Sequence, residues 1–562
     1  MFKLKIALIA LFACFVFACK VTQKAGDGNA TPTPAPTAQQ DAAAATQGWT
    51  TEDRRAFYHT SQGTRVVPYK WFLAVEEGGF AQQPFFTDAR AARYNLIPDP
   101  DTTNNPDRLP VGLVKDVASD GEFISVTCAA CHTGQIRFNG TTMRVDGGPA
   151  MTNLNGFFRE MYEGIGRTLV NLPKFERFAQ KVLGDRNSLI ERARLREQMT
   201  KSLVGTFAKI LQGKVKDLYP TEEGFGRLDA LGRGGNLVLA TGIGDEHNLA
   251  VGNAPVSFPH LWGTPSFDWV QWNGSIQQPM ARNVGEALGV NTPVALKGDP
   301  ADLFKSEVKI ENVHLMETLL QKLQPPRWPE ALLGQIDREK AARGDALYRQ
   351  HCAVCHESQP APPNEFGKVF LRINMYPLEV IGTDPNDAVN FNRRTARTGQ
   401  LGKPPVNLPP TVTAAAATQF VAGEVAKRKY DELGIPPEKR QEMDGFRPNN
   451  IRAPLGYRAR NMDGIWATAP YLHNNSVPNL YQLLLPADKR DARFFVGNLE
   501  YDPKAVGFQT GSFPGGFELR TNITGNSNAG HEFRDGARVK GVIGPLLTDD
   551  ERWAIIEYLK TR

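Results

Sequence analysis

The sequence predicts a mainly α-helical fold of two domains, with long loops and a few short strands. Three observations predict it. The chain has 562 residues, which is more than one small core holds, because a domain averages about 150 residues. Apolar residues recur at helical spacing over residues 151–217 and again near the C-terminus. A short cysteine-containing motif occurs once in each half of the chain, which favours two domains.

The repeated motif has the form C-x-x-C-H. Its residues are Cys128, Cys131 and His132 in the first pentad and Cys352, Cys355 and His356 in the second. In this pattern the two thiols form thioethers with the vinyl groups of a haem, and the adjacent imidazole ligates the haem iron. A chance pentad is expected roughly once in a thousand such chains. The sequence therefore predicts two covalently bound haem c groups, with His132 and His356 as proximal iron ligands.

The charge balance excludes one class of partner. Lys and Arg number 65 and Asp and Glu number 60, so the net charge is only +5. A nucleic-acid-binding chain of this size would carry a larger basic excess. The 40 prolines and 52 glycines are typical of a loop-rich globular protein. We therefore expect a redox partner or a small molecule rather than nucleic acid.

Residues 1–19 read as a signal peptide. Two lysines precede an apolar run over residues 6–18, which is too short to span a bilayer as a mature helix. Residues 16–19 read Val-Phe-Ala-Cys and resemble a lipobox, in which Cys19 becomes a lipidated first residue. Ordinary signal cleavage is the alternative. Residues 20–48 are rich in Ala, Thr, Pro, Gly and Gln and predict a flexible low-complexity linker.

Cysteine use agrees with export. Cys14 and Cys19 belong to the signal and the other four cysteines belong to the pentads, so none remains for a structural disulfide. Covalent haem attachment takes place outside the cytoplasm. We therefore expect a periplasmic protein, anchored to the outer membrane if Cys19 carries lipid and otherwise free of the membrane.

Within the first half, the folded part starts near Trp49, where aromatic residues and a helix-start signal coincide. Residues 60–127 are interrupted by prolines and predict loops over a haem edge. Residues 122–127 favour a short strand that leads into the first pentad, and residues 135–145 alternate like a small hairpin. Residues 151–217 predict amphipathic helices.

A proline cluster at residues 324–329 predicts the boundary between the halves. We expect an N-terminal haem domain over residues 49–325 and a C-terminal cytochrome c haem domain over residues 326–562. The second half begins with a helix over residues 335–350 that runs into its pentad. It ends with a capping box at Thr548, followed by apolar residues at helical spacing. First and last helices of small c-type cytochrome domains usually pack together, so we expect this contact here.

The group opposite each proximal histidine decides whether the iron carries electrons or catalyses. An iron with two strong protein ligands passes electrons, whereas an open sixth position binds O₂ or peroxide. His531 lies in the small-residue loop 525–533, which would allow a close approach to a haem. His473 lies in a second loop that prolines constrain. Met462 is the nearest methionine, and core packing is the better interpretation for it.

Four segments resemble a known family. Residues 465–480 resemble the matching segment of the bacterial dihaem cytochrome c peroxidase and MauG superfamily. Residues 126–135, 271–275 and 525–533 are similar to the branch of that superfamily that contains the secreted rubber oxygenase RoxA. The likeness covers most of residues 90–562.

The resemblance implies a role for each matching residue. The haem held by His132 would be the reactive one, with its distal side available to oxygen or peroxide. His531 would be the second axial ligand of the haem held by His356. Trp272 resembles the tryptophan between the two haems, where an indole can relay electrons, and core packing is the alternative. For His473 the resemblance implies a structural role or hydrogen bonding near a haem.

One departure from the family concerns the substrate. The rubber oxygenase has a phenylalanine near its reactive haem, shortly after the bridging tryptophan, whereas residues 283–289 contain no aromatic residue. This difference argues against rubber cleavage and leaves the redox chemistry untouched.

We therefore expect an oxidoreductase with peroxidase-like or dioxygenase-like chemistry. It would use peroxide or O₂ at the N-terminal haem and transfer electrons through the C-terminal haem. Its partners would be a redox cytochrome or small electron donor, or an apolar organic substrate. The alternatives are a non-catalytic dihaem electron-transfer protein and a surface-attached redox partner of another enzyme. The sequence leaves open the choice between peroxide and O₂, the substrate and the oligomeric state.

Overall fold

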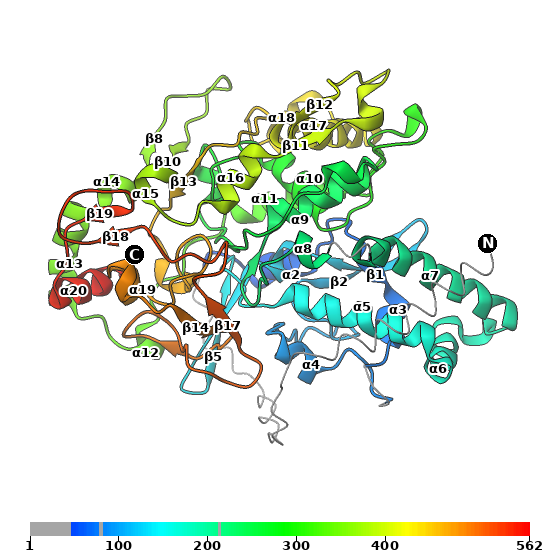
Figure 1. Ribbon diagram of the computed structural model, residues 1–562, viewed down its shortest axis with the longest axis horizontal. Coiled ribbons are helices and arrows are strands. Elements are labelled where there is room, and N and C mark those ends of the chain that lie inside the picture. The colour runs from blue at the N-terminus through cyan, green and yellow to red at the C-terminus, as the bar shows by residue number, and fades with distance from the viewer. Residues whose placement is uncertain (1–46, 78–81, 212–214) are drawn as a thin grey trace.

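The computed structural model describes residues 47–77, 82–211 and 215–562 (Figure 1). The predicted signal over residues 1–19, with Cys19, lies outside the described residues, as does the linker up to residue 46. None of the described helices is long and apolar enough to cross a membrane.

The prediction of a mainly α fold is wrong. Helices account for 41% of the structure and strands for 15%. The described strands form one three-stranded sheet and eight two-stranded sheets. They are short because the 40 prolines and 52 glycines interrupt the chain. The long connections satisfy their backbone hydrogen-bonding groups by pairing short segments, and such segments carry too few residues for a periodic signal.

The N-terminal half begins with a helix and a small sheet. Helix α2 (Thr51–His59) starts at a capping box and confirms the predicted start near Trp49. Strands β1 (Val67–Pro68), β2 (Leu113–Ala118) and β3 (Gly121–Val126) pair in the order β1-β3-β2. Strand β3 confirms the strand expected before the first pentad. Strands β1 and β2 show that the region expected to be loops is partly regular.

The hairpin expected after the first pentad is present. It consists of β4 (Thr133–Phe138) and β5 (Thr141–Asp146). Its turn residues Asn139 and Gly140 have φ of 47° and 78°, the left-handed values that a two-residue type I′ turn requires. The first pentad therefore lies between two regular elements, β3 and β4.

The expected amphipathic helices are α5 (Leu154–Val170), α6 (Leu172–Leu183) and α7 (Leu189–Leu211). Phe157 of α5 and Phe178 of α6 are buried in one apolar cluster with residues of β3. Figure 1 shows these helices at the end of the molecule opposite to α13 and α20.

A second helical group covers the middle of the molecule. Helix α10 (Pro279–Gly289) packs against α11 (Ile310–Leu320), α17 (Ala414–Glu432) and α9 (Ala230–Gly235). A π-helical segment, Asn236–Gly242, continues α9. Because α10 is enclosed by these elements, its polar residues Arg282 and Asn283 lie inside the protein rather than on its surface.

The first and last helices of the C-terminal half pack together, as expected. Helix α13 (Arg338–His351) leads into the second pentad, and α20 (Asp549–Leu559) starts at the expected capping box. Gly344 permits the close approach, because a Cβ atom there would lie 1.9 Å from the carbonyl oxygen of Ala554. The contact fixes the helix from which the second pentad emerges.

One buried cluster extends through both halves of the chain. It contains Trp49 and Phe57 from the first half and Trp466 and Ile555 from the second. The indole Nε1 of Trp262, in the first half, also donates to the carbonyl oxygen of Asp463, in the second, at 2.8 Å. The halves therefore share a core, and the domain boundary between residues 325 and 326 stays a prediction.

Shorter elements connect these parts. The helices are α3 (Tyr69–Ala74), α4 (Asp88–Arg93), α8 (Val215–Leu218), α12 (Glu330–Leu333), α14 (Ala353–His356), α15 (Leu378–Ile381), α16 (Asn386–Arg393), α18 (Pro437–Met443) and α19 (Leu480–Leu483). The strand pairs are β6 (Arg227–Leu228) with β7 (Val256–Ser257), β8 (Gln359–Pro360) with β9 (Leu371–Arg372), β10 (Asn374–Pro377) with β13 (Gly456–Ala459), β11 (Thr395–Arg397) with β12 (Thr411–Thr413), β14 (Arg493–Val496) with β17 (Phe517–Arg520), β15 (Tyr501–Asp502) with β16 (Gly507–Phe508), and β18 (Glu532–Phe533) with β19 (Val542–Gly544).

Candidate functional site

The second pentad forms a single helical turn, α14, directly after α13. The Nδ1 atom of His356 lies 2.7 Å from the carbonyl oxygen of Arg460 and donates its proton there. That hydrogen bond leaves Nε2 as the free lone pair, which is the arrangement of a metal-binding histidine. Burial lowers the pKa of His356, so the ring stays neutral, as a metal ligand must be.

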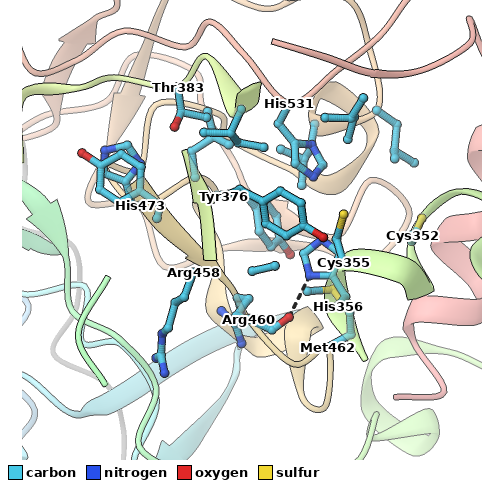
Figure 2. Close-up of a pocket in the computed structure, with 18 of the residues that line it drawn as sticks. Cys352, Cys355, His356, Tyr376, Thr383, Arg458, Arg460, Met462, His473 and His531 are labelled. Atoms are coloured by element: carbon cyan, nitrogen blue, oxygen red, sulfur yellow. Dashed lines mark hydrogen bonds between the residues drawn. The ribbon is translucent and has the colours of Figure 1, made fainter. Parts of the chain in front are cut away.

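A second histidine faces His356. The ring centroids of His356 and His531 are 6.1 Å apart, with an angle of 63° between the rings. This separation fits two imidazoles that share one metal ion, because two metal–nitrogen bonds of about 2 Å plus the inner half of each ring add up to roughly 6 Å. Burial lowers the pKa of His531 to about 3, so it too stays neutral. Figure 2 shows both rings directed at the same cavity.

The loop that carries His531 is held in place by close backbone contacts. Gly530 has φ of 77°, and a Cβ atom there would lie 2.4 Å from the carbonyl oxygen of Ile381. The guanidinium of Arg490 donates to the carbonyl oxygens of Gly530 and His531, each at 2.9 Å. Only glycine allows this approach, and the buried arginine fixes the position of the next residue.

The cavity between these residues has a volume of about 570 Å³ and mostly apolar walls. Cys352, Cys355, His356 and His531 all line it (Figure 2). The volume falls in the range of about 300–1,000 Å³ that is usual for bound cofactors. Among the residues that the structure describes, no three His, Cys, Asp or Glu side chains form a metal site by themselves. Two thiols, two facing imidazoles and apolar walls fit a covalently attached haem.

The first pentad has the same proximal arrangement. His132 follows the short 3₁₀ turn Cys128–Ala130, and its Nδ1 donates to the carbonyl oxygen of Pro259 at 2.8 Å. Burial lowers its pKa to about 4. The residues therefore fit a second covalently attached haem. The ring of Phe258 contacts that of His132, with centroids 6.3 Å apart, and no histidine ring of the described residues does so.

The free thiols are unsuited to a catalytic role. Burial raises the pKa of Cys131 to about 12, and it raises the pKa of Cys352 to about 12. Nucleophilic cysteines have lowered values and an electropositive surrounding. The cysteines are therefore better suited to covalent attachment than to thiolate chemistry.

Trp272 lies between the two parts of the site. It lines the 570 Å³ cavity and also a second cavity of about 190 Å³. Its indole Nε1 donates to the carbonyl oxygen of Ser257 at 2.8 Å, and the Ser257 N–H donates to the carbonyl oxygen of His473 at 2.7 Å. The ring is thus fixed in the wall that separates the cavities. Its relay role stays a prediction.

The second cavity has charged residues that the sequence reasoning missed. Arg282 and Glu286 of α10 line it. Arg282 is ion-paired with Glu317, and Glu286 accepts a hydrogen bond of 2.8 Å from Gln271. Glu286 lines this cavity with a side chain that is 43% exposed, and partial burial raises its pKa. The charges of Glu286 and Arg282 also act on the thiol of Cys128, which places this group beside the first pentad.

His473 is not placed opposite a pentad histidine. Its ring stacks on Tyr457, with centroids 3.9 Å apart, and lines the larger cavity. Burial lowers its pKa to about 4. Met462 lines the same cavity and is buried. The structure therefore gives both residues packing positions in the cavity wall.

Comparison with known proteins agrees with this arrangement. Residues 456–495, which include β13 and His473, match the family model described as RoxA-like, cytochrome c-like. The "Uncharacterized protein y4iJ" of Sinorhizobium fredii (strain NBRC 101917 / NGR234) is 38% identical over 565 residues, which cover 92% of each chain. The "Uncharacterized protein y4iM" of the same organism is 30% identical over 325 residues, which cover 54% of this chain and 64% of the relative. The chain therefore belongs to the family of protein y4iJ, and it contains a RoxA-like, cytochrome c-like domain, which implies covalently bound haem c.

Proposed function

We propose that this protein is a periplasmic dihaem c-type oxidoreductase that uses peroxide or O₂ at the first pentad. Electrons would pass through the haem of the second pentad. The difference between the two pentads carries this proposal, because the ring of His356 contacts that of His531, whereas no histidine ring of the described residues contacts that of His132. When bound, haem iron supplies one-electron redox chemistry and, with an open position, binds O₂ or peroxide.

Different residues of the chain would bind the haems, transfer electrons and handle protons. Nε2 of His132 and of His356 would hold the two proximal positions, and His531 would complete the second site. Trp272, fixed in the wall between the cavities, would pass electrons from one site to the other. Glu286, whose pKa burial raises, would accept and donate a proton near the first pentad. Arg282 and Glu286 lie in an otherwise mostly apolar wall, where their polar groups would hydrogen-bond peroxide.

The partner would be a reduced cytochrome or a small electron donor. An apolar organic substrate belongs to the dioxygenase form of the proposal. For location we propose the periplasm, with an outer-membrane anchor through Cys19.

A non-catalytic dihaem electron carrier is the second candidate, and one observation favours it. His260 is buried, and its Nδ1 has no hydrogen-bond partner among the described residues. The charge of His132 acts on it, so it is close to the first pentad. If His260 ligated the first iron, both irons would be closed.

Three measurements separate these candidates. A pyridine haemochrome spectrum of the purified protein should give two haem c groups per chain, and fewer would contradict the proposal. Electron paramagnetic resonance of the oxidised protein should show one bis-histidine signal and one different signal. Two bis-histidine signals, one of which disappears in His260→Ala, would establish the carrier. Oxidation of a reduced cytochrome by peroxide, measured beside oxygen uptake with unsaturated lipid, then tests the chemistry.

A further inference from the structure

Two arginines beside the second pentad have no carboxylate partner among the described residues. Arg458 is the last residue but one of β13, and Arg460 directly follows this strand. Both line the larger cavity (Figure 2). The guanidinium of Arg458 has no hydrogen bond or ion pair to a described residue, and its buried Nε is unpartnered. Its one ring contact is with Phe267, at 5.8 Å.

Arg460 is only partly satisfied. Its Nη1 donates to the hydroxyl of Thr468 at 3.0 Å, and its Nε donates to the carbonyl oxygen of Asn461 at 3.3 Å. Its Nη2 is buried without a partner in the described chain. Burying a cation without a counter-charge is unfavourable, so the arrangement points to an anion that the protein itself does not supply.

Other buried arginines of this fold are satisfied differently. The guanidinium of Arg490 donates to carbonyl oxygens of Leu483, Leu485, Gly530 and His531. Arg394 likewise donates to the carbonyl oxygen of Asn248 and the side chain of Asn236. Backbone oxygens can therefore satisfy the hydrogen bonds of a buried guanidinium here, and no such oxygen of the described residues bonds the guanidinium of Arg458.

The pair lies between the two pentads. The carbonyl oxygen of Arg460 accepts the proton of His356 Nδ1 at 2.7 Å. The backbone N–H of Arg458 donates to the carbonyl oxygen of Trp272 at 3.0 Å. The charges of both arginines act on His260, on which the charge of His132 also acts. A carboxylate bound here would be close to both pentads.

We propose that Arg458 and Arg460 form a carboxylate-binding site that holds the propionate groups of the attached haems. A guanidinium matches a carboxylate with two parallel hydrogen bonds, and such charge-assisted pairs are strong where water is excluded. The two cations would also stabilise the reduced form of both irons, because reduction lowers the positive charge nearby. This inference rests on the haem attachment in the proposed function.

The test uses the purified holoprotein and Arg458→Gln, Arg458→Lys, Arg460→Gln and Arg460→Lys. The readout is the midpoint potential of each haem by spectroelectrochemistry. Each Gln variant should lower the midpoint potential of both haems by about 59 mV. For one electron, this shift is about a tenfold decrease in the ratio of reduced to oxidised iron at a given potential. Each Lys variant should keep most of the potential, because it keeps the charge.

Arg452→Gln is the matched control. Arg452 belongs to the same segment, but its Nε donates to the carbonyl oxygen of Gly274 at 2.8 Å and its guanidinium stacks on Trp269. In this variant the ratio of reduced to oxidised iron at a given potential should change by less than twofold for either haem.

The outcomes are distinguishable. Full haem content with unchanged potentials in the Gln variants would overturn the proposal. Loss of haem in a Gln variant with retention in the Lys variant would support it, whereas loss in both would show a role in folding only and contradict it. A haem count below two in the unaltered protein would instead contradict the proposed function.

Discussion

The two pentads share their proximal side and differ on the opposite side. His132 and His356 each donate from Nδ1 to a backbone carbonyl oxygen, at 2.8 Å and 2.7 Å. Opposite His356 lies a second imidazole, whereas beside the first pentad lie the charged side chains of α10. Each proximal histidine comes from five consecutive residues and is oriented by one distant carbonyl oxygen, whereas different segments surround the opposite side of each site. Identical motifs thus have different surroundings, to which the proposed function assigns different roles.

The two cavities also differ in the ionisable residues that line them. Arg458 and Arg460 are among those of the larger cavity, whereas the smaller one combines Arg282 and Arg394 with Glu286 and Asp387. Burial lowers the pKa of Arg458 to about 10 and raises the pKa of Asp387 to about 8. Arg458 and Arg460 therefore suit the larger cavity to anions, and Asp387 keeps its proton at neutral pH in the smaller one.

Removing the cysteine pair of either pentad should have the largest effect, because each double variant loses one of the two haem sites. Cys128→Ala with Cys131→Ala should halve the haem content, lower peroxide turnover by more than about 100-fold, and leave the bis-histidine signal intact. Cys352→Ala with Cys355→Ala should also halve the haem content but remove that signal. The haemochrome assay and paramagnetic resonance measure both. Identical spectra in the two double variants would show that the sites are equivalent.

His531→Gly should make the second site resemble the first. Loss of one imidazole should replace the bis-histidine signal and slow electron transfer by about 10- to 100-fold, since axial ligation sets the potential. Haem content should stay at the level of the unaltered protein. His473→Gln is the control, because His473 stacks on Tyr457 instead of facing His356, and its spectrum should not change. An unchanged spectrum in His531→Gly would refute the assignment of this ligand.

Gly530→Ala tests whether the close backbone approach beside His531 stabilises the protein. Its Cβ atom would meet the backbone of residues 381–383 at 2.4 Å, so we expect a loss of about 2–4 kcal/mol in the free energy of unfolding. Gly536→Ala is the matched control, because Gly536 has φ of 107° but nothing within 4 Å of such an atom. It should lose about 1 kcal/mol. Thermal unfolding compares the two, and equal losses would mean that the close approach at Gly530 is unimportant.

Asp387→Asn tests the smaller cavity. Burial is the main cause of its raised pKa, with the charges of Asp229 and Asp384 adding to it. An unfolded aspartate has a pKa of about 3.9. Between that value and about 8 the unfolded chain releases a proton that the folded chain keeps, so stability falls as pH rises. The Asn variant should flatten this slope, and at pH 7, about three units above the pKa of the unfolded aspartate, it should be more stable than the unaltered protein by up to about 4 kcal/mol. Denaturant unfolding at pH 5, 6, 7 and 8 measures it, and parallel slopes would contradict the assignment.

Local sequence signals predicted the parts that local physics determines. The pentads, the hairpin after residue 132 and the capping box at Thr548 each occupy a few consecutive residues. The contact between α13 and α20 was also predictable, because it is shared by small c-type cytochrome domains. His531 was found from its small-residue loop and from the family resemblance, and the structure brings it to His356.

Other features depend on contacts that no local pattern records. The two-stranded sheets pair distant short segments, as Phe494 pairs with Leu519 in β14 and β17, and the mainly α prediction failed there. Nothing in the neighbourhood of Arg458 or Glu286 indicates which side chain faces a cavity. The roles of the carbonyl oxygens of Pro259 and Arg460 could not be predicted from the sequence either. Every residue has a backbone carbonyl group, so the residue type does not indicate which one accepts a hydrogen bond from a histidine. Whether the boundary at residues 325 and 326 divides two folding units stays a prediction.

The position of His531 in the chain has a consequence for biogenesis. Thioether formation at Cys352 and Cys355 requires only the pentad, whereas the facing imidazole arrives with the loop that Arg490 fixes, far towards the C-terminus. In the proposed function, the second haem site would therefore pass through a stage of maturation in which one side is uncovered. A chain that stalled before this loop closed would leave the second haem without its facing imidazole.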